Sequence, residues 1–174
     1  VDLGVIGAVK QDPSLVMRVE FPDLKGSLSE RLYFRGTAFD RYDGHSWANT
    51  RLHRRSLIRS EDGAFQTGSD PVIIPTGLRQ EVLLEPLDVP VLFGATGVEL
   101  VKGDFPVVQM DVMGNLYLPY APSGRFTYTV YSSPRRLGRD ERAGKSFRYP
   151  DSILSHFLQL PHLTPRVGEL AQAV

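Results

Sequence analysis

Hydrophobic and polar residues alternate along much of the first 133 residues, which is the pattern of β-strands with one buried face. Every second residue is apolar in LVMRVEF (15–21) and again in RFTYTVY (125–131). Further short strands are predicted between turn residues, at 72–74, 80–85, 89–93, 98–101, 107–112 and 115–120. The pattern predicts about nine strands with turn signals every 8 to 12 residues, as in antiparallel sandwiches and barrels. No long helical pattern separates the strands, so a parallel α/β sheet is not predicted.

The stretch around the only Trp of the chain predicts a hairpin. Residues 31–42 read as extended, with Gly36 as a bulge. Asp43 and Gly44 form a two-residue turn signal, because Gly tolerates a positive φ at low cost. Residues 45–50 would be the returning strand.

A two-residue turn also fixes which residues face each other. Tyr42 would pair with His45, and Asp40 with Trp47, whereas a longer loop would change this register. We expect Asp40 to accept hydrogen bonds from backbone amides or from a cation such as Arg35, which is a structural role.

The period changes in the C-terminal part of the chain. Residues 134–150 are polar and rich in Arg, without periodicity, and predict a loop or linker. A short helix is expected from Asp151 or Ser152 onward. Thr164 and Pro165 then read as the N-cap and first position of a second helix. We therefore expect a β-domain at 1–133, a linker at 134–150 and short helices at 151–174.

Both ends of the sequence suggest a piece of a longer protein. The chain begins with Val1 and not with Met. Val167, Leu170, Ala171 and Val174 form an apolar stripe that reaches the last residue without a C-cap. We therefore expect the C-terminal helices to lead toward a further domain.

Composition narrows the function. Lys plus Arg and Asp plus Glu number 20 each, so no global positive field would attract nucleic acid. Cysteine is absent, which excludes disulfides, thiolate metal ligands and a Cys nucleophile within these residues. No apolar run approaches the roughly 18 residues of a membrane span.

No catalytic, cofactor-binding or metal-binding residues are predicted. The chain contains no phosphate-binding Gly-rich motif and no HExxH motif, and its four His residues lack zinc-ligand spacing. His45 and Ser46 are neighbours on a strand and would point to opposite faces, which argues against a Ser-His pair. Asp40, Asp43 and Gly44 do not follow the order of a calcium loop.

Two surface features leave alternatives open. The Arg-rich stretches 51–59 and 135–148 could bind nucleic acid or a phosphorylated surface, but solvated loops are favoured because few aromatic residues are interleaved. Four aromatic residues could form a stacking platform for a sugar: Tyr33, Phe34, Tyr42 and Trp47. Alternatively, half of them lie in the hydrophobic core and the others pack over it. On the first reading, Tyr42, His45 and Trp47 are candidate binding residues for glycan or peptide.

The stretch LYFRGTAFDRYDGHSW (32–47) resembles the signature of a bacterial family, the N-terminal extracytoplasmic domain of membrane-embedded transglutaminase-like (TgpA-type) proteins. The similar residues are Leu32, Tyr33, Phe34, Arg35 and Gly36, followed by Tyr42, Asp43, Gly44 and Trp47. Phe34 stands where Trp is frequent in the family. Four further stretches resemble family segments in the expected order: 15–21, 81–90, 125–133 and 157–171.

The resemblance implies an architecture and a function. By this resemblance, the full protein would contain, in order, a bundle of membrane helices, this β-domain, a papain-like transglutaminase core with a Cys-His-Asp triad, and a final membrane helix. The chain would then be a non-catalytic accessory domain outside the cytoplasm. Its expected partners are the core and the membrane helices of the same protein, the core being an acyltransferase or a cysteine peptidase. A glycan- or peptide-binding module is the alternative.

On this reading, Tyr33, Arg35, Gly36, Asp43, Gly44 and Trp47 form a structural signature. Trp47 would anchor the core, and its replacement by Ala would cost about 3–5 kcal/mol, as for other buried large-to-small changes.

Overall fold

The computed structural model describes residues 13–26, 31–68, 77–133, 149–161 and 164–173. The chain forms two compact units. Unit 1 comprises Val1–Pro13, Phe39–Leu52 and Glu141–Val174, so far as these are described, and unit 2 comprises Ser14–Ala38 and His53–Asp140. The sequence predicts 39–52 as part of the β-domain, but the structure groups this segment with the C-terminal residues. The predicted linker lies almost wholly outside the described residues.

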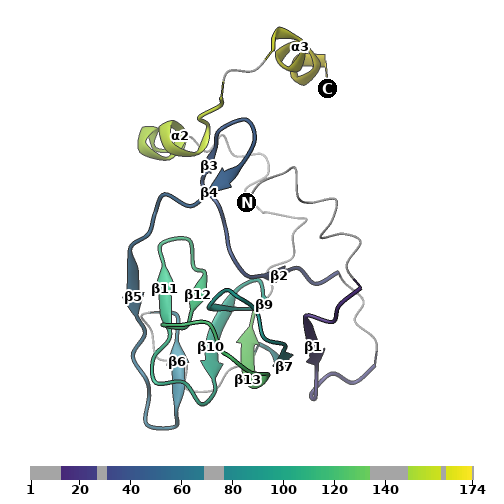
Figure 1. Cartoon of the computed structure of the whole chain (residues 1–174), viewed down its shortest axis with the longest axis vertical. Coiled ribbons are helices and arrows are strands. Elements are labelled where there is room, and N and C mark those ends of the chain that lie inside the picture. The colour runs from purple at the N-terminus through teal and green to yellow at the C-terminus, as the bar shows by residue number, and fades with distance from the viewer. Residues whose placement is uncertain (1–12, 27–30, 69–76, 134–148, 162–163, 174) are drawn as a thin grey trace. The chain divides into compact units, whose positions relative to one another are not determined.

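The described residues contain many short strands and two short helices (Figure 1). The strands are β1 (Met17–Glu20), β2 (Phe34–Arg35), β3 (Arg41–Tyr42), β4 (Trp47–Ala48), β5 (Arg54–Ser56), β6 (Ala64–Gln66), β7 (Leu78–Leu84), β8 (Val91–Leu92), β9 (Gly94–Ala95), β10 (Val98–Lys102), β11 (Gln109–Asp111), β12 (Leu116–Tyr117) and β13 (Phe126–Ser132). The helices are α2 (Asp151–Phe157) and α3 (Pro165–Ala173).

Unit 2 is built from antiparallel sheets. A five-stranded sheet has the order β1-β7-β13-β10-β6, and a four-stranded sheet has the order β5-β11-β12-β8. A third, two-stranded sheet joins β2 to β9. Every strand pair in the described residues is antiparallel. The prediction of a mainly β, antiparallel domain with short C-terminal helices is therefore confirmed.

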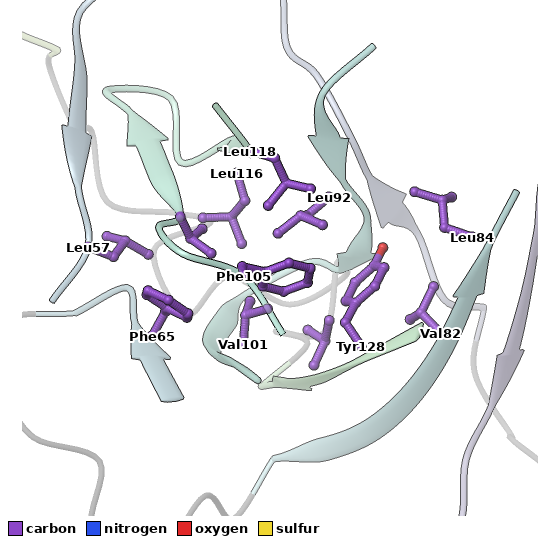
Figure 2. Close-up of a cluster of buried hydrophobic side chains, with 12 residues drawn as sticks. Leu57, Phe65, Val82, Leu84, Leu92, Val101, Phe105, Leu116, Leu118 and Tyr128 are labelled. Carbon is purple, nitrogen blue, oxygen red and sulfur yellow. The ribbon is translucent and has the colours of Figure 1, made fainter. Parts of the chain in front are cut away.

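Alternation along the strands produces the core of unit 2. In β7 and β13 every second side chain is buried, as the pattern of β13 predicts. Val82 and Val130 from the five-stranded sheet share one cluster with Leu92 and Leu116 from the four-stranded sheet. The rings of Phe105 and Tyr128 lie among these aliphatic side chains (Figure 2). The two sheets thus share one apolar core, the arrangement of a sandwich.

One strand is missed by the sequence pattern. Residues 60–70 read as a polar loop, yet β6 lies within them and pairs with β10, with Phe65 opposite Val101. Phe65 is 1% exposed and Ala64 is 0% exposed, so this strand reaches the core although most of the residues around it are polar. The strand predicted at 72–74 lies outside the described residues.

The C-terminal helices begin where the sequence predicts. α2 starts at Asp151, although its N-cap position is Pro150 and no side chain caps it. α3 starts at Pro165, and the amide of Val167 donates to the carbonyl of Thr164. Neither of these two helices of the described residues is long and apolar enough to cross a membrane.

Phe65 provides a test of the shared core. We expect Phe65→Ala to lower the free energy of unfolding of unit 2 by about 3–5 kcal/mol, because it removes a buried ring and leaves a cavity. The nearby Ile58 is 85% exposed and serves as a control, for which Ile58→Ala should change stability by less than about 0.5 kcal/mol. Urea unfolding followed by circular dichroism measures both. Equal losses in the two variants would contradict the placement of β6.

Candidate functional site

The residues of the signature fall into both units. Tyr33 precedes β2, and Arg35 and Gly36 lie at the end of β2, in unit 2. Asp43, Gly44 and Trp47 belong to the hairpin β3–β4, in unit 1. The signature residues therefore do not form one site. The half in unit 2 and the half in unit 1 each have their own contacts.

The hairpin has a longer turn than predicted. Tyr42 pairs with Trp47 and Arg41 with Ala48, so four residues, 43–46, form the loop, and the predicted two-residue register is wrong. The Asp43 carboxylate causes the difference, because its Oδ1 accepts the amides of His45 and Ser46 at 2.8 and 2.7 Å. Gly44 has a φ of 104°, as a turn Gly should.

Trp47 is not a core anchor. It stacks on Tyr42 with ring centroids 4.9 Å apart and an interplanar angle of 26°, and it remains 39% exposed. The register is the reason, since the pairing places the two rings side by side on one face of the hairpin. Tyr42 is fixed from its other end, because its hydroxyl donates to the Gly44 carbonyl at 2.7 Å. His45 is exposed in the turn.

Asp40 is the buried centre of unit 1. Its side chain has no exposed surface. Oδ1 accepts the Thr50 amide at 2.6 Å, and Oδ2 accepts the Thr50 hydroxyl at 2.7 Å. The prediction that Asp40 accepts backbone amides is confirmed, but its other partner is His156 and not Arg35.

His156 and Gln159 bring the C-terminal segment to this carboxylate. His156 Nε2 lies 2.6 Å from Asp40 Oδ2, and Gln159 Nε2 donates to the Asp40 carbonyl at 3.1 Å. Arg51 Nε also lies 3.2 Å from His156 Nε2, and its guanidinium lies 5.5 Å from the centre of the Phe157 ring. Figure 1 shows α2 beside the hairpin.

Two groups compete for one nitrogen of His156. A proton on Nε2 satisfies Asp40 but faces the N–H of Arg51, whereas a bare Nε2 can accept from Arg51 but faces a carboxylate. The shorter distance and the buried negative charge favour the proton on Nε2. The imidazole then donates to Asp40, and Arg51 contributes mainly through Phe157.

The electrostatics of Asp40 are those of a structural carboxylate. Burial raises its pKa, but the hydrogen bonds from Thr50 and His156 outweigh burial and lower the pKa to about 2. No hydroxyl or other nucleophile is seen bonded to His156 among the described residues. Nor do three His, Asp or Glu side chains of the described residues gather as metal ligands. The arrangement binds the hairpin and the C-terminal segment together.

The other half of the signature lies against a second buried network. Arg35 Nε donates to Asn115 Oδ1 at 3.1 Å. The side-chain amide nitrogen of Asn115 donates to the Asp111 carboxylate at 2.8 Å. The Tyr117 hydroxyl donates to the same carboxylate at 3.0 Å. Gly36 is no bulge, because it follows β2, and a Cβ there would overlap the ring of Phe93.

Sequence reasoning misses His156, Gln159 and the pair Asp111–Asn115. The spacing D-x-x-G-N at 111–115 is a turn signal, since Asp111 accepts the amides of Met113 and Asn115, and it could have been found. Asp40 and His156 are 116 residues apart, and a single sequence holds no signal for this pairing.

Comparison with known proteins agrees with the resemblance. A family model described as the TgpA N-terminal domain matches residues 1–139. The chain belongs to the TgpA N-terminal domain family. No curated protein matches it.

Two solved structures resemble the whole of this TgpA N-terminal domain chain. Both are crystal structures of the periplasmic domain of TgpA from Pseudomonas aeruginosa, one of them bound to ethylmercury. The TM-score is 0.63 for each, at 24% and 25% identity, over 100% and 99% of this chain. The chain spans about 55% of the length of the solved domain. The extracytoplasmic location expected from the sequence agrees with the periplasmic origin of both structures.

The lowered pKa of Asp40 predicts an acid-sensitive unit 1. A carboxyl with a pKa near 2 when folded, against 3.8 ordinarily, stabilises the fold above about pH 4. This stabilisation is lost as the pH falls toward 2. Asp43, whose pKa is also about 2 because of hydrogen bonds from Ser46 and His45, acts in the same direction.

Urea unfolding at pH 5, 3 and 2, followed by Trp47 fluorescence, measures this loss. Asp40→Asn should flatten the pH dependence of the free energy of unfolding. The control Asp104→Asn, at an exposed position in unit 2, should leave it unchanged. An unaltered slope in Asp40→Asn would contradict the role given to the Asp40 carboxylate.

Proposed function

We propose that this chain is a non-catalytic, extracytoplasmic accessory domain that positions a transglutaminase-like catalytic core following it in the same protein. The observation that supports the proposal is the double attachment of Asp40, which binds His156 through its carboxylate and Gln159 through its carbonyl. Both partners lie in the segment 151–161, which runs into the stretch 157–171 that resembles the family's passage into the core.

The hairpin holds this segment at several points. Besides the two bonds to Asp40, Arg51 packs over Phe157, and a side chain at Gly44 would meet Pro161 at 3.7 Å. Hydrogen bonds to a buried charge are worth about 1.5–3 kcal/mol each, more than surface contacts. A segment held in this way can carry orientation from the signature hairpin to whatever follows it.

The apolar surface of the segment supports a partner beyond the hairpin. Leu158 and Leu160 are 68% and 74% exposed, directly beside the residues that bind Asp40. Large apolar side chains gathered on a surface mark contact sites. In the proposal, the core and the membrane helices of the same protein are the partners on this side.

Hydrogen exchange in the full-length protein tests this role. Asp40→Ala should raise exchange in residues 151–161, because the buried bonds are lost, and should lower the turnover of the downstream core. Asp62→Ala is the matched control, since Asp62 is an Asp in unit 2 whose pKa is also about 2 because of Lys102 and Ser60. It should leave both quantities unchanged.

Two results would contradict the proposal separately. Unchanged exchange in Asp40→Ala would show that the hairpin does not hold the segment. Raised exchange with full turnover would show that the hold exists but does not position the core.

A second function is favoured by the exposed Trp47 stacked on Tyr42. Exposed aromatic rings stack on sugar rings or on apolar side chains. The alternative function is therefore a glycan- or peptide-binding module with Tyr42, His45 and Trp47 at its surface.

Titration of the Trp47 fluorescence with chitotriose and with an Ala-Pro-Tyr tripeptide tests this alternative, because the chain has a single Trp. A binding module predicts saturation with one of them, and a weakening of roughly 2- to 10-fold in Tyr42→Leu. Emission that stays constant with both ligands would contradict the binding-module alternative.

A further inference from the structure

A pocket in unit 2 combines one cation with an apolar wall. Its volume is about 260 Å³, and it lies where β2, β9, β10, β11 and β12 come together. Leu92, Val98, Met110 and Leu116 supply apolar lining, and Arg35 is the one ionisable side chain among the described residues that line it. The pocket therefore combines one positive charge with an aliphatic wall, and Thr67, Thr96 and Asn115 add polar lining.

The guanidinium of Arg35 is oriented from inside the protein. Asn115 is 1% exposed, and its amide nitrogen must face the Asp111 carboxylate, so its oxygen faces Arg35. That oxygen accepts from Nε alone. No described residue is seen to accept a hydrogen bond from the two terminal amino groups of Arg35.

The buried network also fixes the charge. Burial raises the pKa of Asp111, but hydrogen bonds from Asn115, Tyr117 and Met113 outweigh this effect and hold the pKa below its usual value. Asp111 is therefore ionised, and the neutral side chain of Asn115 bonds both Asp111 and Arg35. Arg54, whose guanidinium lies 3.6 Å from the centre of the Tyr117 ring, adds a second positive charge near Asp111.

Glycines border the pocket on several sides. Gly36, Gly68, Gly97 and Gly114 all line it, so main chain and not side chains forms much of the rim. A small ligand can approach this backbone closely. Gly114 has open space where a Cβ would be, with no heavy atom within 4 Å.

From these observations we propose that the pocket binds an organic carboxylate that carries a small apolar group. The two terminal amino groups of Arg35 hold the carboxylate as a fork, which is the geometry for which Arg is suited. The apolar group lies against the aliphatic wall. A free acid of amino-acid size and the C-terminal residue of a polypeptide share this chemistry.

The signature Arg gains a role from this site. The sequence predicts it as structural, and its bond to Asn115 is structural. The same bond leaves the outer edge of the guanidinium for a ligand. This inference does not depend on the proposed accessory function, because it concerns unit 2 alone.

Binding of N-acetyl-L-leucine to the whole chain tests the site. Nitrogen–proton NMR spectra should show saturable shifts at the amides of Gly36, Gly97 and Gly114, with a dissociation constant in the millimolar range expected of so small a ligand. N-acetyl-L-leucinamide, which has the apolar group without the charge, should bind roughly 10- to 100-fold more weakly. Acetate, which has the charge without the apolar group, should also bind more weakly.

Variants identify the residue. Arg35→Gln should abolish the shifts, and Arg35→Lys, which keeps the charge but not the fork, should weaken them by roughly tenfold. Arg31→Gln is the matched control, an exposed Arg shortly before β2 that does not line the pocket, and should bind as the unaltered chain does. Thr96→Phe keeps Arg35 and fills the pocket, so it should also abolish binding. It decides the matter if Arg35→Gln does not fold.

The two sources of the carboxylate are separated by acetyl-Ala-Ala-Leu. Binding of this peptide as tight as that of N-acetyl-L-leucine would point to a polypeptide C-terminus, and much weaker binding would point to a small free acid. Either result supports the proposal. Equal binding of the acid and the amide, no saturable shift up to about 50 mM, or unaltered binding by a folded Arg35→Gln would overturn it.

Discussion

The bond between Asp40 and His156 joins the hairpin of unit 1 to its C-terminal segment through a buried carboxylate. A carboxylate with no exposed surface is costly unless hydrogen bonds replace the lost water. Here the donors come from Thr50 on one side and from His156 on the other, so hairpin and C-terminal segment satisfy the same charge. The hairpin cannot release the segment without leaving that charge partly unpaired. This constraint explains why residues 116 positions apart belong to one unit.

The two halves of the signature follow the same physical plan. In unit 1 a buried Asp gathers Thr50 and His156, and in unit 2 the buried Asp111 gathers Asn115 and Tyr117. Each network holds a short strand that has few ladder bonds of its own, β3 in one case and β2 in the other. Strands of two residues contribute little by themselves, so the charged networks and not the sheets fix these segments.

The sequence predicts the architecture better than it predicts the site. Alternation in β13 is a local property, and it is found as predicted. The hairpin register depends on whether the loop after Tyr42 has two or four residues, which the sequence leaves open. The surroundings of Trp47 depend on this register, so their prediction is wrong too. Strand β6 could not be predicted, because the buried Phe65 lies in a polar stretch without an alternating pattern. His156 could not be found, since its partner is fixed only by the tertiary fold.

In this view the hairpin holds the segment 151–161, and the outer edge of Arg35 binds a carboxylate. A double-mutant cycle on Asp40→Ala and His156→Ala tests the central contact most directly. We predict a coupling energy of about 1–3 kcal/mol in the unfolding of unit 1, as for residues in one buried network. A coupling within about 0.3 kcal/mol of zero would mean that the two residues act independently, and it would contradict the account.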